Sequence, residues 1–266
     1  MHLHERCIIH FKIIKGKNMI VTQESNSAHW YTKDGQPSYT RMGKNGMFRN
    51  TTLRDAKKEG LLPSVTTIIG CLAKPGLERW KQEQVLLASL TLPRNDNEPE
   101  ADWLTRVIQD SRSTGKDAME RGTNMHNILE SYFNQEFMPE YPDYVRRTEK
   151  KLRDHFGDHF WKPEKSFAHP LGFAGKVDLH SEEGIVVDFK TKSSLENAAV
   201  YTEHILQLVA YAHGLNMPKA RCAIAFVSDD DTQIHEIDEN DLQHHWKMFQ
   251  CLVTYFKLKN NLSLGE

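Results

Sequence analysis

The feature that most constrains the fold is a change of hydrophobic period near residue 158. Before this point apolar residues recur at helical spacing, and after it three consecutive runs of strand period cover 160–168, 173–180 and 184–190. Helical spacing returns at 203–213, and a further strand is expected at 220–227. The order of helix, three strands, helix and strand predicts an α/β fold, with a central mixed β-sheet flanked by helices.

The flanking regions predict a β-rich start, a helical block and a C-terminal helix. Strands are expected at 7–14, 19–23, 29–32, 38–42 and 232–237, and helices at 65–72, 77–90, 103–111, 115–133, 144–156 and 242–256. Asp34-Gly35 is expected to turn a hairpin, Ser64 to cap a helix, and 91–102 to form a surface loop. We therefore divide the chain into an N-terminal β-rich appendage (1–60) and one α/β domain (61–266), composed of a helical block (61–157), a core sheet with its helix (158–238) and the last helix (239–266).

Composition excludes several classes of protein. No apolar run approaches the roughly 20 residues that span a bilayer, so no membrane segment is expected. The first residues lack the pattern of a signal peptide, which favours a cytoplasmic protein. The four cysteines (Cys7, Cys71, Cys222 and Cys251) form no CxxC pair and no metal-ligand spacing, so neither a disulfide framework nor a zinc or iron–sulfur site is indicated.

The net charge of −2 averages two unlike halves. Residues 1–90 carry 14 Lys and Arg against 7 Asp and Glu, whereas residues 91–266 carry 20 against 29. A basic first half suits contact with a polyanion, and we expect salt-sensitive nucleic-acid binding through it. The run Asp229-Asp230-Asp231 is expected to be a hairpin turn on a face kept away from such a partner.

Chemistry is concentrated on two of the predicted strands. Asp188 and Lys190 are two residues apart, so their side chains leave the same face of one strand, and Asp178 lies near the end of the strand before it. Two carboxylates suit a hard divalent cation such as Mg²⁺ or Mn²⁺. An Asp-x-Lys pair by itself is usually an exposed ion pair, but Val186 and Val187 place this strand in a buried sheet, where such a pair requires a reason.

Two helical pairs accompany these strands. His126 and Glu130 are four residues apart on one helix, as are Gln207 and Tyr211 on another, so each pair shares a helical face. Alone, each pair is weak: a single His on an amphipathic helix is more often a surface or core residue than a ligand. The indication of a functional site comes from the joint occurrence, in this order, of the His126 pair, Asp178, the Asp188 and Lys190 pair, and the Gln207 pair.

The set resembles the motif series of the PD-(D/E)xK nuclease superfamily, in its RecB-like branch. The matching motifs are Gly122-xxx-His126, Gly175-xx-Asp178, Asp188-x-Lys190 and Gln207-xxx-Tyr211. The segments 62–68 and 74–80 also resemble bacteriophage-type exonucleases of this branch, which includes the mitochondrial genome maintenance exonuclease. The resemblance implies the nuclease core, in αβββαβ order, over about residues 60–215, with an N-terminal β-rich and helical elaboration.

The resemblance also implies roles for individual residues. Asp178, Asp188 and the backbone carbonyl of Phe189 would be metal ligands, and His126 would bind a second or regulatory cation, so that one or two Mg²⁺ or Mn²⁺ ions are implied. Lys190 would position the hydrolytic water, and Gln207 and Tyr211 would orient Lys190 and the substrate. Glu130 and Glu164 are candidates for a supporting shell or for solvated carboxylates. Because the clustered cysteines of the iron–sulfur members have no counterpart, no cluster is expected.

The implied function is hydrolysis of DNA phosphodiester bonds from ends, giving 5′-phosphate products in recombination, repair or replication. DNA contacts are expected from the helical block, at Ser64, Thr66, Lys74, Arg79, Lys81, Lys116 and Arg121. A single-strand annealing protein is an implied partner, in a bacterial host cell if the gene belongs to a phage. The alternatives are a structure-selective or restriction-type endonuclease of the same fold, and a non-catalytic DNA-binding module.

Overall fold

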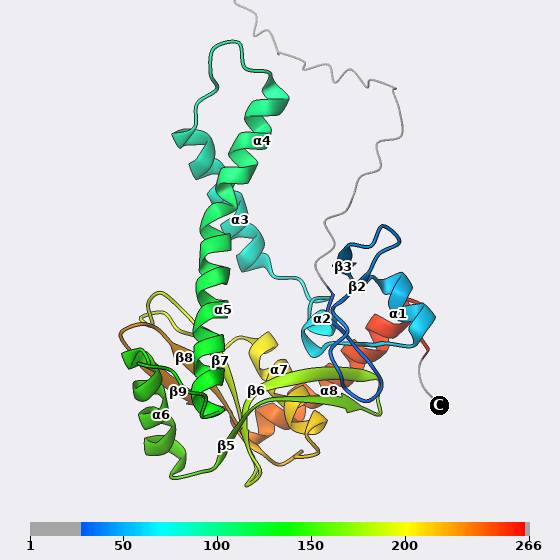
Figure 1. Cartoon of the computed structure of the whole chain (residues 1–266), viewed down its shortest axis with the longest axis vertical. Helices are drawn as coiled ribbons and strands as arrows, with labels where there is room; N and C mark the ends of the chain where they lie inside the picture. The colour runs from blue at the N-terminus through cyan, green and yellow to red at the C-terminus, as the bar shows by residue number, and fades with distance from the viewer. Residues whose placement is uncertain (1–27, 264–266) are drawn as a thin grey trace, which may run out of the picture.

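A five-stranded mixed sheet forms the centre of the protein, seen here in a computed structural model that describes residues 28–263 (Figure 1). Its strands in order across the sheet are β5 (Trp161–His169), β6 (Phe173–Ser181), β7 (Ile185–Thr191), β8 (Arg221–Val227) and β9 (Thr232–Glu236). All neighbours are antiparallel except β7 and β8, which run parallel. The parallel pair needs a crossover, which α7 (Thr202–Gly214) supplies. The mixed α/β fold predicted from the sequence is confirmed.

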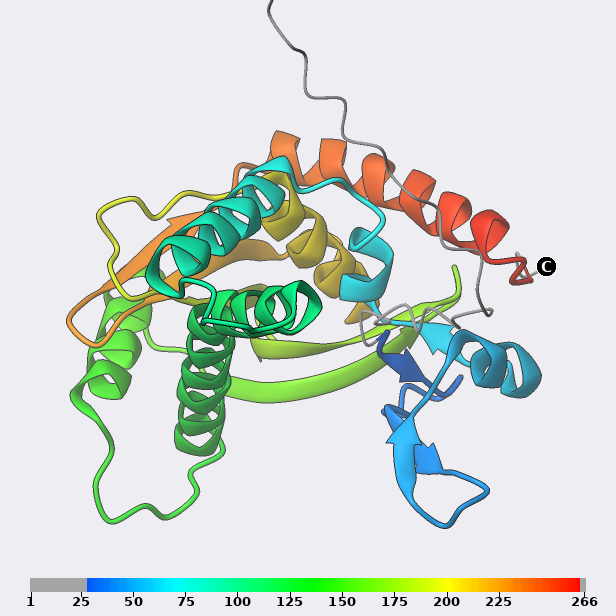
Figure 2. The ribbon, with the colours of Figure 1, turned by 90° about the horizontal axis from the view of Figure 1, so that it is seen from above.

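Helices cover both faces of the sheet. One face packs against α7 and the C-terminal α8 (Glu239–Lys259), and the other against α5 (Ser113–Phe133) and α6 (Asp143–Phe156). Figure 2 shows α7 and α8 together on one side of the strands. Strand alternation produces this division, because Val186 joins the α7 and α8 core whereas Val187 joins the α5 and α6 core. The strand β7 is therefore buried on both faces.

The described part of the N-terminal region departs from the sequence prediction. Asp34-Gly35 does turn the chain, with Gly35 at φ 85°, but β1 (Trp30–Tyr31) pairs mainly with β4 (Leu62–Pro63). The predicted hairpin is present in a short form, because Tyr31 bridges Pro37 in antiparallel fashion and the Ser38 N–H donates to the Trp30 carbonyl at 2.8 Å. A second hairpin joins β2 (Thr40–Met42) to β3 (Phe48–Asn50). A helix, α1 (Leu53–Glu59), was missed, although Thr52 caps it in a reciprocal pair with Asp55. The strands predicted at 7–14 and 19–23 lie outside the described residues.

The N-terminal region shares the main core. Trp30 is fully buried, and its ring lies 6.4 Å from that of Phe256 on α8. Ala56 of α1 belongs to the same apolar cluster. Two arginines of the basic first half, Arg41 and Arg49, both form ion pairs with Asp55. The proposed division at residue 60 is thus not a break in the hydrophobic core.

A helical hairpin projects from the sheet (Figure 1). After the short α2 (Val65–Ile69), which Ser64 caps as predicted, α3 (Pro75–Thr91) leads away and α4 (Glu100–Ser111) returns toward α5. We call residues 75–111 the α3–α4 hairpin. Large exposed apolar side chains gather on it: Leu77, Trp80, Val85, Leu86, Leu87, Leu90, Leu104 and Ile108. Its 4 basic and 7 acidic residues give an acidic excess. None of the described helices is long and apolar enough to cross a membrane.

Candidate functional site

The site begins where two neighbouring strands separate. The pairing of β6 with β7 ends at Leu179 and Val187, one residue short of Asp178 and Asp188. Beyond that point the N–H of Phe189 donates to Oδ2 of Asp178 at 3.0 Å, so a carboxylate replaces a backbone carbonyl as the acceptor. The two carboxylates therefore lie on adjacent strands where the ladder is interrupted.

Asp188 is a fully buried carboxylate with 0% of its surface exposed. The Lys190 ammonium lies 2.6 Å from its Oδ2. Neither oxygen has a well-aligned hydrogen-bond partner among the described residues. A buried carboxylate in this condition is costly to the fold, and such groups are usually paired or bound to a metal. This buried acid, paired with Lys190 but without an aligned hydrogen-bond donor, is the strongest sign of a functional site among the described residues.

A relay of side chains on α7 holds Lys190 from the other side. The Lys190 ammonium donates to Oε1 of Gln207 at 3.0 Å, and Nε2 of Gln207 donates to the hydroxyl of Tyr211 at 2.8 Å. The spacing of four residues on α7 places Gln207 and Tyr211 on one face, as the sequence indicated. Lys190 is thereby fixed between a carboxylate and an amide.

His126 approaches from α5, across the opposite face of the sheet. Its Nδ1 lies 3.6 Å from Oδ2 of Asp178, and its ring meets the edge of Phe189. Gly122, one turn earlier, lets α5 come close to the end of β7, because a Cβ there would lie 2.8 Å from Oγ1 of Thr191. The structure thus brings together Asp178, Asp188, Lys190, His126, Gln207 and Tyr211.

The two glutamates of the predicted supporting shell behave differently. The register between β5 and β6 places Glu164 opposite Asp178, and Glu164 is ion-paired with Lys176. Its φ of 55° lies in the left-handed region, which is strained for a residue other than glycine. Glu130 lies on α5, where no hydrogen bond or ion pair within residues 28–263 joins it to His126.

Electrostatics keep the Lys190 side chain charged. Burial alone would lower the pKa of Lys190, but the carboxylates of Asp188 and Asp178 outweigh it and raise the pKa. Burial raises the pKa of Asp188, and the Asp178 charge adds to this while Lys190 opposes it. Burial, together with the two carboxylates, also raises the pKa of Tyr211, so its hydroxyl stays protonated. Two carboxylates and one ammonium are thus held close together, and among them the Asp188 carboxylate is fully removed from solvent.

His204 is a neighbour of this site that the sequence analysis did not name; its ring packs on Phe226, and its Nδ1 accepts the Tyr201 N–H. It precedes Gln207 by three residues on α7, and burial together with the Lys190 charge lowers its pKa to about 4. The imidazole is therefore neutral at physiological pH. The signal that could have found it is its position on the same helical face as Gln207 and Tyr211.

The donor set fits a hard cation that needs few protein ligands. Among residues 28–263 no group of three or more His, Cys, Asp or Glu side chains is arranged to hold a metal. Mg²⁺, however, is commonly bound by one or two carboxylates with water and substrate oxygens completing its shell. Asp178 and Asp188 supply two carboxylates, and the oxygens of Asp188 lack aligned donors. The residues present therefore fit Mg²⁺ or Mn²⁺ better than an ion that needs a cage made entirely of protein ligands.

The predicted DNA-binding residues do not converge on the site as a basic wall. Arg79, Lys81 and Lys116 are each paired with a glutamate of their own helix: Glu83, Glu78 and Glu120. Arg121 reaches across to Asp229, at 2.5 Å, so the acidic turn between β8 and β9 anchors α5.

The remaining three of these residues lie at the base of the α3–α4 hairpin. Ser64 is buried, and its Oγ accepts the N–H of Thr67 as the cap of α2. Thr66 is exposed in the first turn of α2, and its hydroxyl lies 3.1 Å from Oγ of Ser64. Lys74 is exposed immediately before α3. Lys74 is therefore the predicted cation whose charge is not engaged by a neighbouring carboxylate within residues 28–263.

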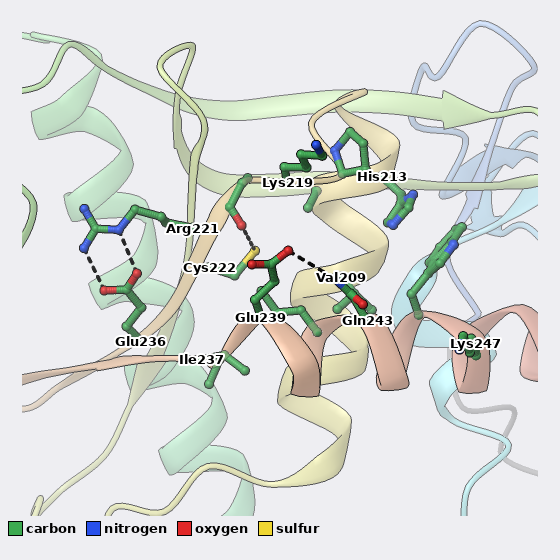
Figure 3. Close-up of a pocket in the computed structure, with 15 residues that line it drawn as sticks. Val209, His213, Lys219, Arg221, Cys222, Glu236, Ile237, Glu239, Gln243 and Lys247 are labelled. Carbon is green, nitrogen blue, oxygen red and sulfur yellow. Dashed lines mark hydrogen bonds and ion pairs between the residues drawn. The ribbon is translucent and has the colours of Figure 1, made fainter.

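An apolar pocket lies away from the six clustered residues, and two of its reactive groups are unsuited to catalysis. It has a volume of about 470 Å³ between α7, α8 and the start of β8, and none of the six clustered residues lines it (Figure 3). Its thiol, Cys222, is buried, which raises its pKa to about 12 and leaves it protonated. Of its two carboxylates, Glu236 is held by Arg221 at 2.7 Å, which lowers its pKa to about 2, and Glu239 accepts a hydrogen bond from Gln243 at 3.1 Å. Neither Cys222 nor Glu236 is poised as a nucleophile or a base.

No protein-family model and no curated protein matches this chain. Two solved structures are similar to it at a low level. SSO0001 shares 15% identity with a TM-score of 0.30, over 66% of this chain and 86% of that one. An alkaline exonuclease (LHK-Exo) from Laribacter hongkongensis shares 14% identity with a TM-score of 0.31, over 68% of this chain and 97% of that one. Likenesses at this level establish neither a family nor an activity for this chain.

Proposed function

We propose that this chain is a metal-dependent DNA exonuclease of the PD-(D/E)xK superfamily, in its RecB-like branch. The proposal depends mainly on one observation, the fully buried Asp188 carboxylate, which lies next to Lys190 and Asp178. Its oxygens accept no well-aligned hydrogen bond from the described residues. The geometry supports the proposal further, because residues spread over 86 positions of sequence meet at one point of the fold.

Three side chains of the site, those of Lys190, Tyr211 and Asp178, have separate roles in this proposal. Lys190, charged and fixed by Gln207, orients the attacking water and stabilises negative charge that develops on the scissile phosphate. Tyr211 keeps Gln207 in the orientation that presents its oxygen to Lys190. Asp178 holds the end of β7 in place through the Phe189 N–H, so that the carbonyl of Phe189 stays near the two carboxylates.

The site is proposed to hold Mg²⁺ or Mn²⁺ through Asp178, Asp188 and the Phe189 carbonyl, with His126 toward a second ion. When bound, such a cation supplies Lewis-acid polarisation of the phosphate and a nucleophilic water. The buried Asp188 carboxylate and the partly exposed Asp178 carboxylate would together favour a divalent cation at this point. The products are proposed to carry 5′-phosphates.

Action from DNA ends is proposed on the family resemblance, together with a single-strand annealing protein as partner. Ser64, Thr66, Lys74, Arg79, Lys81, Lys116 and Arg121 remain proposed DNA contacts. Because most of the cations among them are already paired, we expect each to contribute less than a residue of the site.

The test is digestion of 5′- and 3′-labelled linear DNA, single- and double-stranded, with Mg²⁺, Mn²⁺ or EDTA. The proposal expects progressive shortening from one end with either metal and none with EDTA. Covalently closed circles serve as the control substrate. Cleavage of closed circles contradicts the exonuclease assignment, and activity that persists in EDTA contradicts the metal assignment.

A further inference from the structure

The α3–α4 hairpin has almost no hydrophobic core of its own. Within α3, which is 17 residues long, only Ala88 is buried, and within the 12 residues of α4 only Val107 is buried. Helices of this length are marginal in water unless an amphipathic face is packed against something. The hairpin projects from the sheet (Figure 1), so the core of the sheet does not supply that packing along its outer half.

Four large apolar side chains form one stripe along α3. Trp80, Leu87 and Leu90 follow one another at spacings of seven and three residues, and Leu86 lies four residues before Leu90. These spacings place the four side chains on one face of the helix, as at the seam between two paired helices. Their exposed fractions are 37% for Trp80, 64% for Leu86, 55% for Leu87 and 79% for Leu90. We call these four residues the α3 stripe.

The hairpin holds this stripe on a fixed frame. Near its tip Nη2 of Arg106 donates to Oε2 of Glu98 at 2.8 Å, which ties α4 to the loop before it. At its base Trp80 packs against α5, because a Cβ at Gly115 would lie 3.4 Å from the Trp80 ring. A surface that is fixed before binding loses little conformational entropy when a partner covers it.

The charges of the hairpin disfavour a nucleic acid as the partner of the α3 stripe. Residues 75–91 carry two basic and two acidic residues, whereas residues 92–111 carry two basic and five acidic ones. Phosphates would therefore meet an apolar face beside an acidic helix. The charged pair next to the stripe is balanced, since Arg79 and Glu83 lie 3.0 Å apart. A partner with an equally neutral and apolar face matches α3 better.

The size of the α3 stripe matches what the pairing of two copies requires. A standard interface buries about 800 Å² on each partner, and about 65% of a homodimer interface is apolar. Each copy therefore needs roughly 500 Å² of exposed apolar surface. At their exposed fractions, the four side chains of the stripe offer on the order of 500 Å². Two copies can thus bury a standard interface through α3 alone.

We infer that two copies of this chain associate through their α3 stripes, each α3 lying antiparallel to its counterpart about a two-fold axis. Such an interface is self-complementary, because the same residues face one another from both copies. The two hairpins then pack as a four-helix bundle, which gives each of them the core that it lacks alone. We expect a dissociation constant on the order of 10 µM, so the pair is dissociated in dilute protein. The inference goes beyond the proposed function and does not rest on it.

The experiment is sedimentation velocity on the whole chain, at protein concentrations between about 1 and 200 µM. It compares the wild type with Leu87→Glu, which places a carboxylate in the middle of the stripe, where pairing would bury it. Leu258→Glu on α8 is the matched control, because Leu258 is 58% exposed and Leu87 is 55% exposed. Both leucines face solvent in the single chain, so both variants should fold, and circular dichroism checks this.

For the wild type and Leu258→Glu we expect the mass to rise with concentration from 30.8 kDa toward twice that value. For folded Leu87→Glu we expect the dissociation constant of the pair to rise by at least about tenfold. A wild type that stays monomeric up to about 200 µM overturns the inference, and so does a Leu87→Glu variant that pairs like Leu258→Glu. Pairing by a wild type that does not cleave DNA supports this inference and contradicts the proposed function.

Discussion

The sheet and the α3–α4 hairpin place apolar and charged residues in opposite ways. In the sheet the apolar residues are buried on both faces, and a charged residue, Asp188, lies at 0% exposure among them. In the hairpin large apolar side chains such as Leu90 are exposed, and charged ones such as Arg79 pair with a neighbour on the same helix. The contrast teaches that the net charge of a region is a poor guide to a functional site. A single charge that is buried and incompletely paired is the better indicator.

The largest expected effect is a loss of DNA cleavage, and we expect it from a substitution in the sheet and not from one in the α3–α4 hairpin. Lys190→Met removes the buried ammonium, and with it the group that opposes negative charge beside Asp188. We expect Mg²⁺-dependent cleavage to fall by about 10³-fold, the scale for loss of one preorganised electrostatic donor. The assay is steady-state hydrolysis of labelled linear DNA, with circular dichroism to confirm that the variant folds. A folded Lys190→Met variant with wild-type turnover would remove Lys190 from the reaction.

The second effect is on the free energy of unfolding, and it compares one leucine that packs against the sheet with one leucine of the α3–α4 hairpin. Leu208 on α7 is fully buried, whereas Leu90 on α3 is 79% exposed. Leu208→Ala should cost about 2–5 kcal/mol of unfolding free energy, because it leaves a cavity. Leu90→Ala should stay within about 0.5 kcal/mol. Urea denaturation measures both, and equal losses would show that the hairpin packs far more tightly than its exposure indicates.

The third effect is a pH dependence in the sheet region. His213 on α7 stacks on Trp246 of α8 with 3.6 Å between ring centres, and burial lowers its pKa to about 4. The folded protein therefore prefers the neutral ring. Between about pH 6.5 and pH 4 the unfolded chain binds a proton that the folded one does not, so stability falls as pH falls through that window.

The size of this loss is on the order of 2 kcal/mol, and His213→Gln should remove it. Thermal unfolding at a series of pH values measures the effect. An unchanged slope in His213→Gln would assign the acid sensitivity to other groups.

The smallest effect belongs to the hairpin. Arg79 and Lys81 are exposed and already paired with Glu83 and Glu78. Exposed pairs of this kind contribute little, so Arg79→Ala/Lys81→Ala should change DNA affinity by less than about threefold. Fluorescence anisotropy with labelled DNA measures it. A loss of about tenfold or more would make the hairpin the principal DNA-binding surface.

Sequence reasoning predicted the elements of the sheet region well. The period change near residue 158 predicted β5 to β8 and α7 within two residues at each end, because a strand buried on both faces and an amphipathic helix leave strong patterns. The spacing of Asp188, Lys190, Gln207 and Tyr211 predicted which side chains share a face, and the structure brings them together.

Other features depend on contacts that one-dimensional patterns do not contain. The pairing of β1 with β4 joins residues 30 and 63, which are far apart in sequence, and it is present beside the local turn at Asp34-Gly35. The separation of β6 from β7 at Asp178 depends on a side chain that replaces a backbone partner. The close approach of α5 to the end of β7 depends on Gly122, where a Cβ would lie 2.8 Å from Oγ1 of Thr191. By contrast α1 had a readable signal, the reciprocal cap between Thr52 and Asp55.

The central claim is that the buried Asp188 carboxylate makes this sheet a nuclease site. Asp188→Asn keeps the shape of the side chain and removes its charge, and Arg79→Ala/Lys81→Ala serves as the hairpin control. The measurement is release of labelled nucleotides from linear DNA with Mg²⁺. The account predicts release by the wild type and the hairpin variant, and at least about 10³-fold less by folded Asp188→Asn. Wild-type release by Asp188→Asn would contradict it.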